Sequence, residues 1–280
     1  MDIKLIAFDL DGTLLTTDKR LTDENREALE RAADNGIELV PCTGRFYLGM
    51  PDFIRELPFI NYAVTINGAQ VLDIKNDYDI YSAVIPFEQA MDLLDYCEGL
   101  GVAYDCYFNS RGFMDRRFYD HIEEHLPDPI YCKTLRMMRT PVDDLRELVR
   151  SSGTDVQKIQ MFSGDRPLLK KICEEVISTR KGLIATSSLK NNLEINNEKA
   201  NKGIALNVLA QHLGLSPDQT MAFGDGGNDE SMLDAAGISV VMGNGLNRLK
   251  EKADIVTLTC DENGVAEVIN RLLDGTLERR

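Results

Sequence analysis

Two short acidic segments contain most of the side chains in this sequence that could do chemistry. Asp9 and Asp11 lie in the first, which reads DLDGT. Asp225 and Asp229 lie in the second, which reads GDGGND. Four carboxylates brought together would repel one another unless a cation lay among them, and oxygen ligands without histidine favour Mg²⁺ over zinc. We therefore expect a magnesium site if the fold joins the two segments.

The first segment also has two simpler interpretations. A turn at Asp11 and Gly12 that only reverses the chain is about as common for an isolated sequence of this kind. A calcium-binding loop of the EF-hand type does not fit, because Thr13 stands where the third ligand of that motif belongs. Turn and metal site therefore stay open until other residues are considered.

Two further segments offer groups that bind phosphate. Thr43 and Gly44 supply a hydroxyl and exposed amides, and Lys202 begins a predicted helix whose N-terminus favours anions. A lysine in such a place is more often simply solvated. The order of acidic pair, Thr-Gly, lysine and acidic pair along one chain is a specific combination, and it favours a site that handles phosphate.

These residues follow predicted strands of one sheet. Short apolar runs alternate with amphipathic helices, which predicts an α/β fold with a doubly wound, Rossmann-like parallel sheet. Ligands bind beyond the carboxyl ends of such strands. The strands are expected over residues 3–8, 37–40, 62–66, 220–223, 238–242 and 254–258. The helices are expected between Thr22 and Asn35, through 53–54, over 202–213, 228–236 and 246–253, and from Val265.

Residues 85–190 follow a different pattern. Helices are expected over 87–100, 142–151 and 167–177, and strands over 102–108 and 158–162, as in a separate α+β module. We therefore predict a core domain in two parts, residues 1–84 and 191–280, with an inserted domain over 85–190. An insertion at the catalytic end of a parallel sheet usually covers the site and contributes to specificity.

Composition excludes several classes of protein. The 280 residues are 43% hydrophobic and 28% charged, as in an ordinary globular chain. Forty-six acidic residues against 31 basic ones leave a net charge of −15, which disfavours nucleic-acid and anionic membrane partners. The N-terminus does not resemble a secretory signal, no run reaches the length of a membrane span, and six scattered cysteines favour reduced thiols in the cytoplasm.

The inserted domain contains one group of basic side chains. Five acidic residues between positions 111 and 139 nearly cancel their charge, so a mixed, solvated surface is favoured over a nucleic-acid site. The basic residues are Arg111, Arg116, Arg117, Lys133, Arg136 and Arg139.

On its motifs the sequence resembles the haloacid dehalogenase-like superfamily, and within it the Cof-type phosphatases. The family's first motif, Asp-x-Asp-Gly-Thr, matches residues 9–13, and its second, Thr-Gly-Arg, matches residues 43–45. The third, a lysine, matches Lys202, and the fourth, Gly-Asp-x-x-Asn-Asp, matches residues 224–229. The insertion is placed like the family's α/β cap. Pro41-Cys42 ahead of the second motif departs from the usual apolar strand end.

The resemblance implies an Mg²⁺-dependent phosphatase of small phosphorylated metabolites, such as sugar phosphates, nucleotides or phosphorylated cofactors. Asp9 would be the nucleophile, forming an aspartyl-phosphate, and Asp11 the general acid and base. The metal would be held by Asp9, the backbone carbonyl of Asp11 and Asp225, with Asp229 supporting the metal or the lysine. Phosphate-binding residues would be Leu10, Thr43, Gly44, Lys202 and Asn228.

Three other interpretations are weighed against this one. A phosphomutase of the same superfamily would share the nucleophile and the cap. A phosphorylatable receiver module would share the acidic cluster and the lysine, but it is usually shorter and has no cap. Residues 121–125 fit the zinc-protease pattern H-x-x-E-H, although a solvated helix packed through Phe118, Ile122 and Leu126 explains them better.

Overall fold

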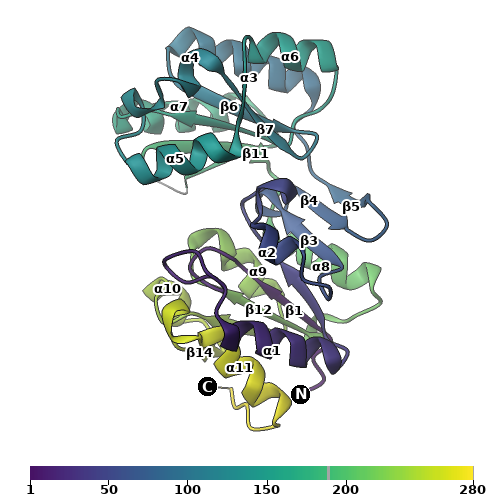
Figure 1. Ribbon diagram of the computed structural model, residues 1–280. Helices are drawn as coiled ribbons and strands as arrows, with labels where there is room; N and C mark the ends of the chain where they lie inside the picture. The colour runs from purple at the N-terminus through teal and green to yellow at the C-terminus, as the bar shows by residue number, and fades with distance from the viewer. Residues whose placement is uncertain (188–189, 280) are drawn as a thin grey trace. The chain divides into compact units, whose positions relative to one another are not determined.

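The computed structural model describes residues 1–187 and 190–279, which fold as two compact units (Figure 1). The core unit comprises residues 1–45, 51–82 and 201–280, and the inserted unit comprises residues 46–50 and 83–200. The chain therefore passes between the units at 45/46, 50/51, 82/83 and 200/201. A simple insertion would need only two such passages.

The centre of the core unit is a five-stranded parallel sheet with the order β14-β13-β12-β1-β2. Strand β1 is buried throughout and lies between β12 and β2, with Phe8 opposite both Phe223 and Pro41. The residues that follow these strands therefore meet at one edge of the sheet. The strands are β1 (Leu5–Phe8), β2 (Glu38–Pro41), β12 (Thr220–Gly224), β13 (Ile238–Val241) and β14 (Ile255–Val256).

Helices of the core unit begin and end close to where the sequence predicts. Helix α1 begins after Thr22, whose hydroxyl accepts a hydrogen bond from the Asn25 amide at 3.2 Å, and Gly36 follows it with φ of 77°. The α-helices are α1 (Asp23–Asp34), α2 (Asp52–Arg55), α8 (Lys202–His212), α9 (Glu230–Ala235), α10 (Asn247–Lys250) and α11 (Gly264–Leu273). The 3₁₀ helices are η2 (Ile66–Gly68), η4 (Pro217–Gln219), η5 (Gly227–Asp229) and η6 (Cys260–Glu262).

The third predicted strand takes a different course. Strand β3 (Tyr62–Thr65) continues the parallel arrangement only through a bridge between Val64 and Cys42. The chain then reverses at Asn67 and Gly68, where φ is 55° and 94°. Strand β3 consequently forms a separate antiparallel sheet with β4 (Gln70–Asp73) and β5 (Tyr78–Ser82).

The inserted unit contains a six-stranded mixed sheet with the order β10-β11-β9-β6-β7-β8. Only the pair β7 and β8 is parallel. The strands are β6 (Ala103–Phe108), β7 (Arg111–Asp115), β8 (Thr140–Val142), β9 (Lys158–Phe162), β10 (Leu183–Thr186) and β11 (Asn192–Asn197). The helices are η1 (Tyr47–Gly49), α3 (Phe87–Leu100), α4 (Arg116–Tyr119), η3 (Ile122–Glu124), α5 (Pro129–Met138), α6 (Leu145–Ser152) and α7 (Arg166–Thr179).

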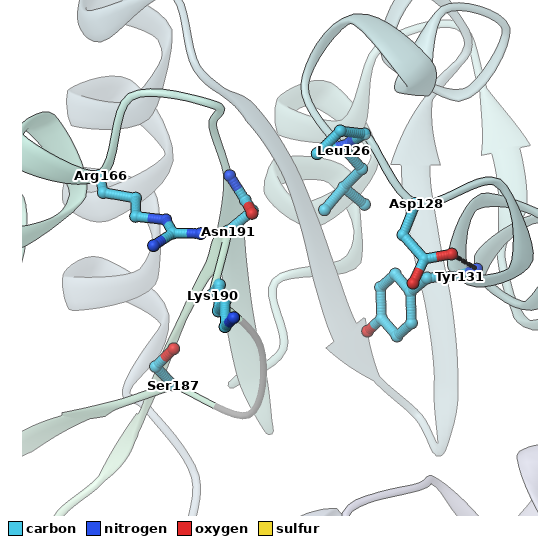
Figure 2. Close-up of a pocket in the computed structure, with 8 residues that line it drawn as sticks. Leu126, Asp128, Tyr131, Arg166, Ser187, Lys190 and Asn191 are labelled. Carbon is cyan, nitrogen blue, oxygen red and sulfur yellow. Dashed lines mark hydrogen bonds between the residues drawn. The ribbon is translucent and has the colours of Figure 1, made fainter.

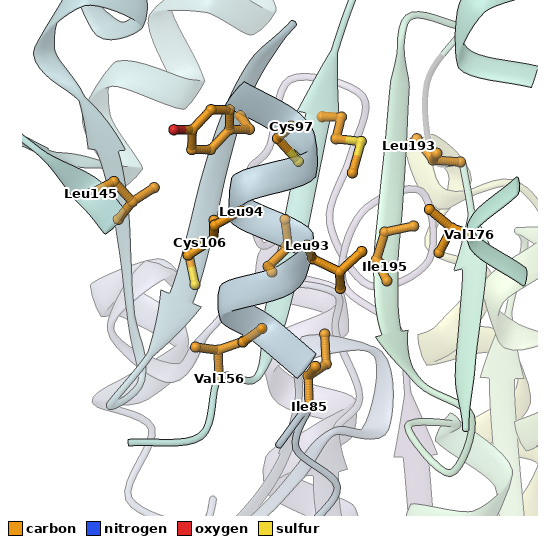
Figure 3. Packing of buried hydrophobic residues seen from close by; sticks show 14 of the residues in the cluster. Ile85, Leu93, Leu94, Cys97, Cys106, Leu145, Val156, Val176, Leu193 and Ile195 are labelled. Carbon is orange, nitrogen blue, oxygen red and sulfur yellow. The ribbon is translucent and has the colours of Figure 1, made fainter. Parts of the chain in front are cut away.

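The two faces of this sheet differ in chemistry. Helices α3, α6 and α7 cover one face through a large apolar cluster that includes Leu94, Cys106 and Ile195 (Figure 3). Alternate residues on the same strands point to the other face, where Asp105, Lys158 and similar polar groups are also buried. Side chains therefore alternate between the two faces of the sheet with a period of two, but the polar side chains are buried as well as the apolar ones.

Three details of the inserted unit correct predictions. The boundary at 190/191 is wrong, because β11 pairs with β9 and the unit continues to Ala200. Arg139 is not solvated: it lies buried and donates to Asp105 and Gln160, whereas Arg116, Arg117 and Arg136 are paired with acidic side chains. Residues 121–125 contain a 3₁₀ turn, η3, rather than the α-helix that the zinc-protease pattern needs.

The helices and the cysteines bear on two further expectations from the sequence. None of the helices within the described residues is both long and apolar enough to cross a membrane. All six cysteines are free thiols, and all but Cys173 are buried.

Candidate active site

Three carboxylates surround one buried lysine at the edge of the core sheet. The Nζ atom of Lys202 donates to Asp9 Oδ1 at 2.7 Å and to Asp229 Oδ1 at 2.6 Å. Oxygens of Asp9, Asp225 and Asp229 all lie within 4.8 Å of one another. One positive charge thus faces three negative ones, which leaves an excess of negative charge in a largely buried place.

Strand pairing and helix capping put these residues together. Asp9 follows β1 and Asp225 follows β12, the strand paired with it. Lys202 is the first residue of α8, whose preceding residue Asn201 accepts hydrogen bonds from two amides of the first turn. Asp229 Oδ2 accepts from the amides of Asp225 and Gly226 at 3.0 and 2.8 Å. Both oxygens of Asp229 are therefore engaged within the protein.

The electrostatics of the group follow from its burial and its charge imbalance. Burial raises the pKa of Asp9 to about 7, with Lys202 acting against the rise and Asp229 adding to it. Burial and the neighbouring Asp229 also raise the pKa of Asp225. For Lys202, burial favours a lower pKa, but Asp229 and Asp9 outweigh it and hold its pKa above the usual range. The lysine is therefore charged at neutral pH.

Asp11 lies apart from this group and is held by cations. Its two oxygens accept hydrogen bonds from Arg45 Nε and Nη2, both at 2.9 Å, and the Lys19 ammonium lies 2.9 Å from Oδ1. Burial favours a higher pKa for Asp11, but Arg45 and Lys19 outweigh it and lower the pKa to about 2. In this arrangement Asp11 is a carboxylate.

Two of the predicted phosphate-binding residues, Gly44 and Asn228, lie close to Asn67. A Cβ atom added to Gly44 would lie 2.9 Å from Asn67 Oδ1, and Asn228 Nδ2 donates to the same oxygen at 3.3 Å. Thr43 is buried, and its amide donates to Val64. Leu10 is also buried, and its carbonyl accepts a hydrogen bond from the Leu15 amide at 2.9 Å.

The structure adds residues to which the motifs assigned no role. Thr13 Oγ1 donates to Asp225 Oδ1 at 2.9 Å, and Asn244 Nδ2 donates to the Gly12 carbonyl at 2.8 Å. A Cβ atom on Gly12, where φ is 94°, would lie 2.6 Å from Asp225 Oδ2. Thr13 stands inside the first motif, and Asn67 and Asn244 lie in short Asn-Gly and Gly-Asn sequences that could have marked them.

The group has the donors that a hard divalent cation needs. Within the described residues, Asp9 Oδ2 and Asp225 Oδ2 accept no hydrogen bond, and the three carboxylates exceed the charge of Lys202. Oxygen donors with excess negative charge are what Mg²⁺ prefers. These residues therefore fit the predicted metal.

A separate cavity of about 760 Å³ lies within the inserted unit. Asp128 and Tyr131 stand on one wall, and Arg166, Lys190 and Asn191 stand on the opposite wall (Figure 2). Asp128 is engaged at the start of α5, where its carboxylate accepts from the amides of residues 130 and 131. The cavity thus combines an aromatic ring with two cations.

Comparison with known proteins agrees with this chemistry. The model of the haloacid dehalogenase-like hydrolase family matches residues 6–269. The chain belongs to that family. This hydrolase is 30% identical to the phosphatase YwpJ of Bacillus subtilis over 293 residues, which covers 97% of this chain and all of YwpJ. It is 32% identical to the 5-amino-6-(5-phospho-D-ribitylamino)uracil phosphatase YwtE of the same organism, with 98% and 99% covered.

Solved structures give the same result for the fold. A haloacid dehalogenase-like hydrolase from Bacteroides thetaiotaomicron matches with a TM-score of 0.82 at 30% identity, covering 96% of this chain and 99% of that one. The predicted superfamily and the α/β class with an inserted domain are confirmed. The hydrolase is a phosphatase, an enzyme that hydrolyses phosphate esters.

Proposed function

We propose that this hydrolase is an Mg²⁺-dependent phosphatase of small phosphorylated metabolites, which works through an aspartyl-phosphate on Asp9. The observation that carries the proposal is the group of Asp9, Asp225 and Asp229 around the buried Lys202. A purely structural cluster would balance its charges, whereas this one leaves room for a cation and for an incoming phosphate.

The proposed reaction has two steps. A carboxylate oxygen of Asp9 attacks phosphorus and the bond to the leaving oxygen breaks, while Asp11, which must first leave Arg45 and Lys19 and take up a proton from water, gives that proton to the leaving oxygen. Water then attacks the phosphorus of the acylphosphate, Asp11 takes a proton from the water, and free Asp9 and inorganic phosphate result. Thr43, the Gly44 amide, Lys202 and Asn228 bind the phosphate oxygens, with the Leu10 backbone beside them.

The metal has a defined place in the proposal. Asp9, Asp225 and the backbone carbonyl of Asp11 would hold Mg²⁺, which would supply the positive charge that allows a carboxylate and a phosphate to meet. Asp229 supports the site through Lys202 and the amides of Asp225 and Gly226, because both of its oxygens are already engaged.

Two lines support small metabolites as the substrates. One of the relatives is named for a phosphorylated ribitylaminouracil. The aromatic and cationic walls of the cavity in the inserted unit suit a small polar organic molecule better than a polymer. We place the enzyme in the cytoplasm, since its six thiols are free and five of them are buried.

Leaving-group dependence tests the assignment of the two aspartates. Asp11→Asn should slow release of phosphate from an alkyl phosphate by about 10²–10⁴-fold, and an aryl phosphate, which needs no proton to leave, should be partly rescued in the first step. Asp9→Asn should show no rescue with either ester. Phosphate found by mass spectrometry on a residue other than Asp9 would refute the mechanism, and an isomeric ester in place of free phosphate would indicate a phosphomutase.

A further inference from the structure

The loop that follows β2 is shared between the two units. Arg45 belongs to the core unit, the next five residues belong to the inserted unit, and Pro51 belongs to the core unit again. The predicted phosphate-binding residues Thr43 and Gly44 lie immediately before this passage. One end of the inserted unit is therefore joined covalently to the loop of the second motif.

Phe46 is the residue that fixes this segment within the inserted unit. It is 6% exposed, and its ring meets the ring of Tyr107 edge to face, with 5.4 Å between the centroids. The short helix η1 folds closely over Phe46, since a Cβ atom on Gly49 would lie 3.1 Å from the Phe46 ring. Met50, the last residue of the segment, is buried too.

Two cationic side chains lie against the ring of Tyr107 and hold it in place. The Arg139 guanidinium lies 4.5 Å from its ring centroid and the Lys158 ammonium 4.3 Å from it. Asp105 binds Arg139 at 2.6 Å, and Glu194 binds Lys158 at 3.0 Å. Phe46 is thus attached to a buried, hydrogen-bonded part of the inserted sheet.

Arg45 is attached equally firmly on the core side. Its guanidinium donates to both oxygens of Asp11 at 2.9 Å, and its carbonyl accepts from the Ile66 amide at 2.9 Å. Neighbouring Cα atoms are only 3.8 Å apart across a trans peptide bond. A single peptide bond therefore joins Phe46, which is held by the inserted unit, to Arg45, which is held by the core unit.

We propose that Phe46 is a positioning residue, which makes the position of Asp11 depend on the inserted unit through Arg45. The inference rests on the proposed function, in which Asp11 is the acid and base. Motion of the inserted unit displaces Phe46 and, with it, Arg45. This changes the hydrogen bonds that Arg45 donates to Asp11. The chemistry is in this way coupled to the inserted unit.

A double-mutant cycle between Phe46 and Arg45 tests this coupling. Phe46→Ala should lower kcat for an alkyl phosphate about tenfold and change kcat for an aryl phosphate by less than about threefold, because only the alkoxide needs the proton from Asp11. In an Arg45→Gln background, Phe46→Ala should add less than about a twofold further loss, since the link to Asp11 is already broken. Gly49→Ala, which crowds the Phe46 ring, should reproduce a weaker form of the effect.

Phe113→Ala is the matched control. Phe113 stacks on Phe108 in the same unit, with 4.7 Å between the ring centroids, and is not part of the ring contact between Phe46 and Tyr107. Phe113→Ala should lower kcat by the same factor for both esters. In the Arg45→Gln background it should lower kcat by that factor again. Melting temperatures of all variants show which are folded, and Phe46→Leu replaces Phe46→Ala if the latter does not fold.

Two outcomes would overturn the inference. Equal losses on both esters with Phe46→Ala would show a merely structural role, as would effects of Phe46→Ala and Arg45→Gln that multiply fully. Failure of the proposed function is a different result, because the wild-type enzyme would then release no phosphate from either ester.

Discussion

The core unit and the inserted unit each bury a cluster of charged side chains, and the clusters differ in their charge balance. In the core unit, Asp9, Asp225 and Asp229 share the single cation Lys202. In the inserted unit, the carboxylates of Asp105 and Glu194 face two cations, Arg139 and Lys158, in separate pairs.

This difference in charge balance distinguishes the candidate active site from a cluster that only stabilises the fold. Burying a charge is costly unless it is paired and hydrogen-bonded. In the inserted cluster each carboxylate is paired with its own cation, and among the described residues Asp105 Oδ1 alone of the four carboxylate oxygens is buried without a hydrogen-bond partner. Gln160 and Asn192 add further hydrogen bonds to Arg139 and Glu194. The core cluster does not meet the condition, and the proposed cation and phosphate would balance its charge. Burial of charged side chains alone therefore does not indicate a functional site, whereas burial of charges that do not balance one another does.

The largest expected contrast comes from the same substitution in each cluster. Asp9→Asn should reduce phosphatase activity to background while the melting temperature stays the same or rises, because a repelling carboxylate is removed. Asp105→Asn should lower the free energy of unfolding by about 3–5 kcal/mol, because Arg139 is left as an uncompensated buried charge. Activity of the folded Asp105→Asn protein should survive. Unfolding curves and initial rates measure both, and a stable, inactive Asp105→Asn protein would erase the distinction between the clusters.

Metal removal should affect the core cluster alone. A chelator should abolish activity, Mg²⁺ should restore it, and Ca²⁺ should inhibit, because its looser coordination misplaces the nucleophile. Saturating Mg²⁺ at about 100 times Kd should stabilise the protein by about 2.7 kcal/mol. Asp225→Asn should weaken this stabilisation, and Glu194→Gln should leave the Mg²⁺-induced shift in melting temperature unchanged. Full activity in excess chelator would end the metal proposal.

Two glycines allow a finer version of the comparison. A Cβ atom on Gly12 would lie 2.6 Å from Asp225 Oδ2, and one on Gly112 would lie 2.7 Å from Arg139 Cδ. Gly12→Ala should reduce kcat/KM by about ten- to a hundredfold through a displaced Asp225 and a strained backbone. Gly112→Ala should instead lower the free energy of unfolding by about 1–3 kcal/mol. A loss of stability with Gly12→Ala together with a loss of activity with Gly112→Ala would contradict the distinction between the two clusters.

The smallest expected effect is a pH dependence of stability without metal. Asp9 has a pKa of about 7 in the folded protein and 3.8 as its ordinary value, so the folded state binds its proton more tightly. Protonation of Asp9 therefore stabilises the fold below about pH 4, and this contribution is lost as the pH rises to about 7. In chelator, the melting temperature of the wild type should fall more over this range than that of Asp9→Asn. Identical pH profiles would show that Asp9 does not carry the excess charge.

Much of the core unit and its site was predictable from the sequence. Strand periodicity put Asp9 and Asp225 directly after buried strands, and the carboxyl ends of parallel strands meet at one sheet edge. Thr22 and Asn35 marked the ends of α1 because capping depends on local hydrogen bonds. Such signals need only the neighbouring residues and the rules of parallel sheets.

The inserted unit was less predictable for a physical reason. Along β6, β9 and β11, Asp105, Lys158 and Glu194 are buried in ion pairs, which their residue types alone do not indicate. The near balance of acidic and basic residues between positions 111 and 139 predicts a mixed, solvated surface there, whereas Arg139 is buried. The end of the unit was set too early, because β11 is defined by its partner β9 and not by its own composition.

Residue types and local spacing by themselves determined the strands of the core sheet, the caps of its helices and the acidic and phosphate-binding segments, since these depend on short-range sterics and hydrogen bonds. Only the tertiary structure decided that Asp229 is fully engaged, that Arg45 holds Asp11, and that Phe46 belongs to the inserted unit. Each of these joins segments far apart in the chain, and a contact of that kind depends on how the elements pack rather than on the neighbours of any one residue.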